Sequence, residues 1–173
     1  RKMGYFDGKD EDFDFAAAYC PADFGGLRYC DARVWSFFNM YGEEDMNKYI
    51  AWAAGDPTAE PMPLYMKPKA PLSLQDMQRG MRDHYEGTPF DITNDLGAGP
   101  YNMPYRPSPL SFEVDGKEYF NERPISTFQT AFTFVAQLRS WLPNAVGGVM
   151  WFGTDDANMV VFTPVYCCAT SVP

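Results

Sequence analysis

The sequence predicts an α+β fold, with helices in the first part of the chain packed on antiparallel strands in the second part. Three features support this fold class. Residues 27–41 carry apolar side chains at helical spacing, residues 115–116 are an Asp-Gly turn pair, and residues 130–139 alternate between apolar and polar side chains. We expect one structural unit over 1–173, long enough to bury a core, whose three parts are a core helix at 27–41, a loop-rich excursion with one helix at 55–109, and antiparallel strands at 110–166.

The helix over 27–41 is predicted by a run of apolar residues that would share one face. Glycines at 25, 26 and 42 lie on either side of this segment and favour helix boundaries there. The following segment, 43–54, predicts a second short helix. Five prolines in 55–71 then predict an extended loop, because proline cannot continue a helix.

A further helix is predicted after Ser73, whose hydroxyl can cap the first turn. Its apolar face would run from Leu74 to Tyr85, with Gly87 beyond its end. Residues 88–109 contain several glycines and prolines and predict a long irregular segment. Ordered loops of this length are often functional.

The strands are predicted by turn chemistry and by alternation. Asp115-Gly116 favours a hairpin between 111–114 and 117–120. In 130–139 the even-numbered positions are mainly apolar, and the pattern predicts one buried face. Residues 148–152 and 159–165 flank the polar segment 154–158 and predict a second antiparallel hairpin.

Composition excludes several classes of function. A net charge of −9 with 14 scattered Lys and Arg argues against nucleic acid binding. No apolar run reaches the roughly 20 residues of a membrane-spanning helix, so we expect a soluble protein, with no indication of whether it is cytoplasmic or exported. The four cysteines are expected to be buried as small hydrophobic residues. With His84 as the single histidine, no zinc ligand set is expected.

Other residue combinations give only weak evidence for a catalytic or metal-binding site. No nucleophile elbow accompanies His84 for a serine triad, although a pair between His84 and one of the four cysteines stays open. Asp155 and Asp156 are interpreted as turn formers rather than acid/base partners. The acidic segment 8–14 is interpreted as solvated, with a calcium loop as the weaker alternative.

Two adjoining stretches carry a family resemblance: 121–143, from Asn-Glu-Arg-Pro-Ile-Ser to Ser-Trp-Leu-Pro, and 147–156, Gly-Gly-Val-Met-Trp-Phe-Gly-Thr-Asp-Asp. They resemble the C-terminal half of the catalytic core of the bacterial dipeptidase A family, which are N-terminal-nucleophile (Ntn) cysteine hydrolases. The resemblance implies a four-layer αββα sandwich, of which this chain would be the second half. It also implies dipeptide substrates, an N-terminal cysteine that forms an acyl-enzyme, and no metal or organic cofactor.

Residue 1 is Arg1, so the implied nucleophile is not at the start of this chain, and both ends look cut. We therefore expect a fragment of a larger enzyme that is inactive in isolation. Its partner would be the remaining half of that enzyme.

The segment 21–33, Pro-Ala-Asp-Phe-Gly-Gly-Leu-Arg-Tyr-Cys-Asp-Ala-Arg, is also similar in outline to penicillin acylases and bile-salt hydrolases. In those relatives an arginine followed by an aromatic residue reaches the nucleophile. Arg28, followed by Tyr29, best matches that arginine. The alternative is that Arg28 and Arg33 are ordinary ion-pairing residues of a helix.

The blocks 81–91 and 94–101 also look like the family. A dipeptidase must recognise a free ammonium group, and loop carboxylates are suited to it. Glu86, Asp91 and Asp95 are the candidates for substrate binding. The alternative is that these carboxylates only fix turns.

A different class of function also fits the sequence, namely a non-catalytic binding or scaffold domain with the same sheet. A free-standing module of that kind should be a monomer without a large exposed apolar patch. A severed half-domain should instead expose a sheet face or edge and self-associate.

Overall fold

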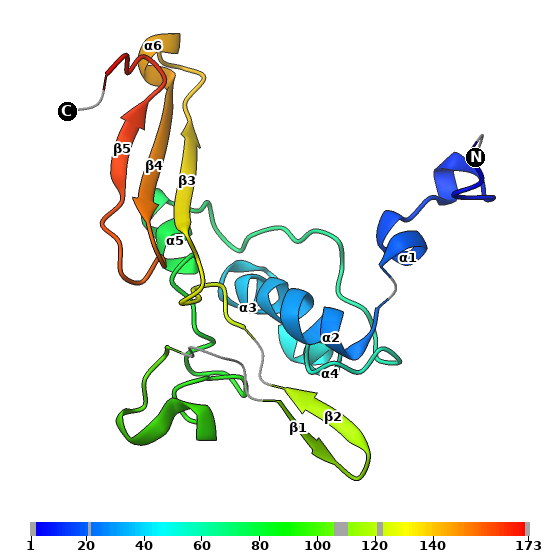
Figure 1. Cartoon of the computed structure of the whole chain (residues 1–173). Coiled ribbons are helices and arrows are strands. Elements are labelled where there is room, and N and C mark those ends of the chain that lie inside the picture. Colours follow the sequence, from blue (N-terminus) through cyan, green and yellow to red (C-terminus); the bar gives the residue numbers. More distant parts are fainter. Residues whose placement is uncertain (1–2, 21, 106–110, 121–122, 172–173) are drawn as a thin grey trace.

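The computed structural model describes residues 3–20, 22–105, 111–120 and 123–171, and it confirms the α+β class (Figure 1). In chain order the elements are η1 (Asp10–Asp12), α1 (Phe15–Tyr19), α2 (Phe24–Gly26), η2 (Leu27–Asp31), α3 (Ala32–Tyr41), η3 (Met46–Tyr49), α4 (Ile50–Ala53), α5 (Leu74–Gly80), η4 (Leu96–Tyr101), β1 (Ser111–Val114), β2 (Lys117–Phe120), β3 (Phe132–Leu138), α6 (Asn144–Gly147), β4 (Gly148–Thr154) and β5 (Thr163–Tyr166). η2 is a π-helix, whereas η1, η3 and η4 are 3₁₀ helices. As expected, the acidic segment 8–14 is exposed.

The predicted helix at 27–41 is present, but its first turn is π-helical. In η2 the Ala32 N–H reaches back to the Leu27 carbonyl, five residues earlier, and a regular helix follows as α3. Gly42 is extended and ends α3. The short helix expected in 43–54 is present as η3 and α4.

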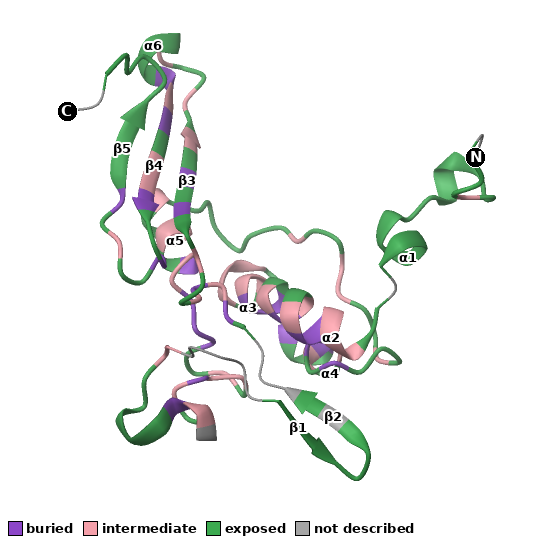
Figure 2. Cartoon of the chain, in the orientation of Figure 1, coloured by how far each residue is buried: buried purple, intermediate pink, exposed green. Residues whose placement is uncertain are grey.

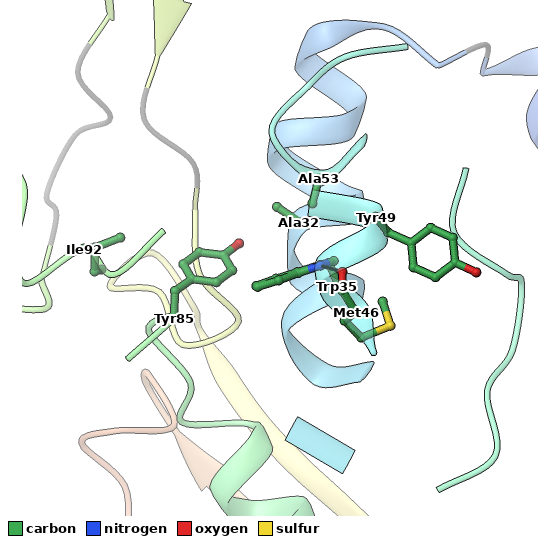
Figure 3. Packing of buried hydrophobic residues seen from close by; sticks show 7 residues of the cluster. All are labelled: Ala32, Trp35, Met46, Tyr49, Ala53, Tyr85 and Ile92. Atoms are coloured by element: carbon green, nitrogen blue, oxygen red, sulfur yellow. Dashed lines mark hydrogen bonds between the residues drawn. The ribbon is translucent and has the colours of Figure 1, made fainter. Parts of the chain in front are cut away.

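The helices pack around an apolar cluster that has Trp35 at its centre (Figure 3). Met46 and Tyr49 of η3 lie on one side of the Trp35 indole, and Tyr85 and Ile92 approach from the other side. The Trp35 indole Nε1–H donates to the Met46 carbonyl at 2.8 Å, so the buried donor is satisfied. This cluster therefore ties the helices to the loop around Tyr85.

α5 begins as predicted and ends earlier than predicted. Ser73 and Asp76 form a reciprocal capping box at its N-terminus. The helix ends at Gly80. Tyr85 is therefore not on its apolar face, contrary to what the sequence pattern predicted. Tyr85 instead lies in a turn with a positive φ of 66°, so two residues of the expected face, Met81 and Tyr85, lie beyond the end of the helix. Helical spacing alone could not detect this left-handed residue.

The two-residue hairpin is confirmed in detail. Asp115 and Gly116 have φ values of 51° and 76°, as a type I′ turn requires, and β1 and β2 pair on either side of them. The second predicted hairpin forms as β4 and β5. β5 starts only at Thr163, because Ala157 and Phe162 in the connection are buried against α5 instead of continuing the strand.

The three-stranded sheet β3-β4-β5 is antiparallel, and only one of its faces is covered by α5 (Figure 1). On the covered face Val135 of β3 packs with α5 residues Leu74 and Met77. On the opposite face Phe132 and Phe134 are 55% and 50% exposed, and Leu138 is 80% exposed. The buried face of β3 is therefore its Thr133 and Val135 face, and the apolar even-numbered face, which the alternation favoured for burial, is open (Figure 2). α5 and the residues that follow β4 cover the Val135 face instead.

The prediction of buried cysteines was wrong: all four are exposed, because Cys20, Cys167 and Cys168 follow the ends of elements and Cys30 lies on the outer side of η2. In the described residues, no helix has the length and apolar character needed to cross a membrane.

Candidate active site

Arg28 lies inside the protein, in the π-helical turn η2. Its side chain is 8% exposed, and its Nη1 donates to the Ala53 carbonyl of α4 at 2.8 Å. The guanidinium carbon lies 4.4 Å from the centre of the Phe90 ring. A buried cation that stacks on an aromatic ring and donates to a carbonyl is held in one orientation. Single π-helical turns frequently occur at functional sites.

Arg33, the other arginine of this segment, has a local role. Its Nε donates to the Tyr29 carbonyl at 2.6 Å, one turn earlier on the same helical segment. This geometry agrees with the interpretation of Arg33 as an ordinary helix residue. Arg28 differs because its contacts reach two other parts of the chain.

The loop after α5 is built around Tyr85, which is fully buried despite its left-handed backbone. Its N–H donates to Asp83 Oδ1 at 3.2 Å, and its hydroxyl donates to the Arg123 carbonyl at 2.9 Å. Its ring lies 6.0 Å from that of Phe90. A left-handed non-glycine residue costs on the order of 1–3 kcal/mol and persists where its surroundings fix it, often at functional sites.

The structure places Glu86 and Asp91 in this same loop. Glu86 directly follows Tyr85, which contacts Arg123, and Asp91 directly follows Phe90, on which Arg28 stacks. Glu86 accepts from the His84 N–H at 2.7 Å, and its other oxygen lies 3.0 Å from His84 Nδ1. Partial burial acts to raise the pKa of Glu86, but the hydrogen bonds from His84 outweigh it and hold that pKa below its ordinary value. The exposed Glu86 carboxylate is therefore charged at neutral pH.

Asp91 and Asp95 both close turns. Asp91 accepts from the Gly87 N–H at 3.0 Å and from the Thr93 N–H and hydroxyl at 2.9 and 2.6 Å. Burial acts to raise the pKa of Asp91, but these hydrogen bonds have the larger effect and hold that pKa below its ordinary value. Asp95 caps η4 by accepting from the Gly97 N–H at 2.8 Å. The turn-fixing alternative thus describes the geometry of both residues.

A buried polar network that the sequence did not indicate connects this loop with the sheet. Asp83 accepts from the Ser36 hydroxyl at 2.7 Å, and its carbonyl accepts from the Ser126 N–H at 3.0 Å. The Ser126 hydroxyl in turn donates to Asp156. All four side chains are buried, so α3, the Tyr85 loop and the turn after β4 are joined through their polar groups.

Asp156 and its neighbour Asp155 differ in their burial and in their hydrogen-bond partners. Asp155 is a turn former as expected, with a φ of 81° and a side chain that accepts from the Asp156 N–H. Asp156 also accepts from the Asn158 N–H at 3.3 Å, but it is 1% exposed and carries the Ser126 hydrogen bond. The turn-former interpretation is therefore incomplete for Asp156. Nothing local in the sequence indicates its bond to a serine 30 residues away.

The open alternative of a cysteine–histidine pair is not formed. His84 is 2% exposed and directs Nδ1 at Glu86, and its ring lies edge-on to Tyr105. In the part of the chain that the structure describes, no cysteine hydrogen-bonds to His84, and no group of three or more His, Cys, Asp or Glu side chains could hold a metal ion.

Replacing Asp83 with asparagine is expected to change how stability depends on pH. Burial raises the pKa of Asp83 above its ordinary value of 3.8. The stability linked to the protonated carboxyl is therefore fully present below pH 3.8 and is lost as the pH rises through the folded-state pKa. The free energy of unfolding of the native chain, relative to that of Asp83→Asn, should fall as the pH rises from below 3.8 towards neutrality.

Urea denaturation of both chains across that range measures the difference. Asp76→Asn serves as the control. Hydrogen bonds from Ser73 lower the pKa of Asp76, so its contribution is fully present above pH 3.8, and the difference from the native chain should stay constant over that range. A constant difference between the native chain and Asp83→Asn would contradict the expectation.

The family model for peptidase family C69 matches residues 1–173. Among individual proteins, the chain is 25% identical to a "Probable dipeptidase" of Salmonella dublin over 166 residues, which cover 96% of this chain and 32% of that protein. It is 23% identical to Dipeptidase A of Lactobacillus helveticus, over 84% of this chain and 25% of that protein. A "Probable dipeptidase" of Latilactobacillus sakei is 29% identical over 80% of this chain and 24% of its own length.

The chain thus spans about a third or less of the length of these curated relatives. No solved structure is significantly similar to it.

Proposed function

The chain belongs to peptidase family C69, and from that premise we propose that it is part of a dipeptidase that cleaves peptide bonds through a cysteine acyl-enzyme. The observation that carries the proposal is the match of the family model over residues 1–173, together with relatives that are named dipeptidases. We further propose that the enzyme is an Ntn hydrolase and that the nucleophilic cysteine lies outside residues 1–173.

In this proposal Arg28 lies near the nucleophile and favours its thiolate form. A guanidinium stays charged at any working pH, and a fixed positive charge nearby lowers the pKa of a thiol. The contacts of Arg28 with Ala53 and Phe90 support the role, because they hold the charge in place before a substrate arrives. The thiolate attacks the peptide carbonyl, the amine product leaves, and water hydrolyses the acyl-enzyme.

The loop of Glu86, Asp91 and Asp95 is proposed to recognise the substrate ammonium group. Glu86 is the best placed of the three, since its carboxylate is exposed and charged. Asp91 and Asp95 already accept backbone N–H groups. Their contribution would be to hold the loop in shape and to add negative charge to it.

Hydrolysis of a panel of dipeptides by the full-length polypeptide that carries this chain tests the proposal. We expect turnover that is abolished when cysteines are alkylated, and none from the 173-residue chain alone. Absence of turnover in the full-length polypeptide would contradict the dipeptidase function and favour a binding or scaffold domain. Thiol-sensitive turnover by the isolated chain would point instead to one of the exposed cysteines, Cys20, Cys30, Cys167 and Cys168.

We also propose that the open face of the β3-β4-β5 sheet packs against the remaining half of the enzyme. Stacked aromatic rings of Phe132, Phe134 and Phe152 form the centre of this face, with ring centres 5.9 to 6.4 Å apart. Contiguous apolar surface of this kind marks interaction sites. The greater length of the relatives supports a partner from the same polypeptide.

In the isolated chain this face is expected to cause concentration-dependent self-association. Phe134→Glu should give a monomer, because it places a charge at the centre of the stacked rings. Phe128→Glu is the matched control, since Phe128 is equally exposed but lies outside the sheet. Sedimentation velocity over a wide range of concentration gives the measurement, and a native chain that stays monomeric throughout would contradict the proposal.

A further inference from the structure

Arg123 is an exposed arginine on the segment that follows β2. Its guanidinium carbon lies 5.7 Å from the centre of the Tyr29 ring, next to Arg28 in sequence. Among the residues that the structure describes, no carboxylate is paired with Arg123. An unpaired guanidinium is notable in a chain whose net charge is −9.

The backbone that carries Arg123 is held from two sides. The Tyr85 hydroxyl donates to the Arg123 carbonyl, and three residues later the Ser126 N–H donates to the Asp83 carbonyl. Pro124, between these two points, is buried. The root of the side chain is therefore fixed while its charged end faces solvent, an arrangement that reduces the entropy lost when a ligand binds.

Arg123 is joined by a hydrogen bond to the loop that carries the acidic residues. The Tyr85 hydroxyl donates to the Arg123 carbonyl, and Tyr85 directly precedes Glu86 in the chain. The ring of Tyr85 also approaches Phe90, on which Arg28 stacks. A dipeptide is short, because two extended residues span only about 7 Å. Its two charged ends therefore need an anion and a cation that are close together.

We propose that Arg123 binds the α-carboxylate of the dipeptide, and this proposal rests on the dipeptidase function proposed above. A guanidinium matches a carboxylate with two parallel hydrogen bonds. Arg28 is less suited to this role, since its guanidinium is buried between Ala53 and Phe90. Arg123 would select substrates that end in a free carboxylate one residue beyond the cleaved bond, and so restrict the enzyme to dipeptides.

The test compares a dipeptide with the same dipeptide carrying a C-terminal amide, using the full-length polypeptide. For Arg123→Met we expect KM for the free dipeptide to rise about tenfold or more, with little change in KM for the amide. Arg123→Lys should recover part of the loss. Arg79→Met, which removes an exposed arginine of α5 far from Tyr29 in sequence, should leave both values unchanged.

Equal effects of Arg123→Met on both substrates, or no effect on either, would overturn the assignment. If the native polypeptide hydrolyses no dipeptide at all, the proposed function fails, and binding decides the role of Arg123 separately. Calorimetry with a dipeptide analogue whose peptide bond is reduced should then show tighter binding of the free carboxylate than of the amide, and Arg123→Met should remove that preference. A native polypeptide without the preference would also overturn the assignment.

Discussion

Replacing Trp35 with alanine is expected to destabilise the helical part of the chain by about 3–5 kcal/mol, as is typical when a buried tryptophan is truncated. Trp35 is 1% exposed and contacts both the helices and the Tyr85 loop. The change opens a cavity and leaves the Met46 carbonyl without its indole donor. Because folded domains are stable by only about 5–15 kcal/mol, a loss of this size is expected to unfold much of the helical part.

Urea denaturation followed by near-ultraviolet circular dichroism measures the loss. Trp141→Ala is the matched control, since Trp141 is 76% exposed and its removal should change the free energy of unfolding by less than about 0.5 kcal/mol. Trp35→Phe should lie between the two, because it keeps most of the ring volume and loses the hydrogen bond. Similar stabilities for Trp35→Ala and Trp141→Ala would show that Trp35 is not the centre of the core.

The parts of the fold that the sequence predicted well are those with a local physical cause. The turn at Asp115 and Gly116 needs positive φ angles that these residue types accept, and the cap at Ser73 needs only a hydroxyl three residues before a helical N–H. The end of α5 was predicted less well. It depends on Tyr85 adopting a left-handed backbone, and tertiary bonds to Asp83 and Arg123 stabilise that conformation.

The orientation of the sheet was beyond local reasoning for a different reason. Alternation in β3 shows that the strand has two unlike faces, but apolarity alone would bury Phe132 and Phe134. The structure covers the Val135 face with α5 and leaves the phenylalanines open. A pattern of period two cannot show which partner covers which face, or whether that partner belongs to these 173 residues.

The candidate site was predictable in outline only. The resemblance selected Arg28 and the acidic loop, and the structure connects them through Phe90. The roles of Ser126 and Asp156 depend on contacts between residues distant in sequence, which no spacing in the chain encodes. Arg123 was missed because a single exposed arginine carries no pattern until its neighbours Tyr29 and Tyr85 are seen.

Arg28→Met is expected to slow alkylation of the nucleophilic cysteine at neutral pH in the full-length polypeptide, because loss of the guanidinium raises the pKa of the thiol. Arg28→Lys should cost less, since it keeps the charge although it loses the planar fork. The structure adds a second effect. The methionine leaves the buried Ala53 carbonyl without its donor, which costs about 1–3 kcal/mol of stability.

The two effects are separated by measuring the alkylation rate as a function of pH under conditions where each variant is fully folded. The thiol effect shifts the midpoint of that profile to higher pH, and a loss of stability alone does not. Arg33→Met is the control, because Arg33 donates to the Tyr29 carbonyl in its own helical segment, and this change should leave the midpoint in place. An unchanged midpoint in Arg28→Met would show that Arg28 does not act on the nucleophile, and a shift in Arg33→Met would transfer the role to Arg33.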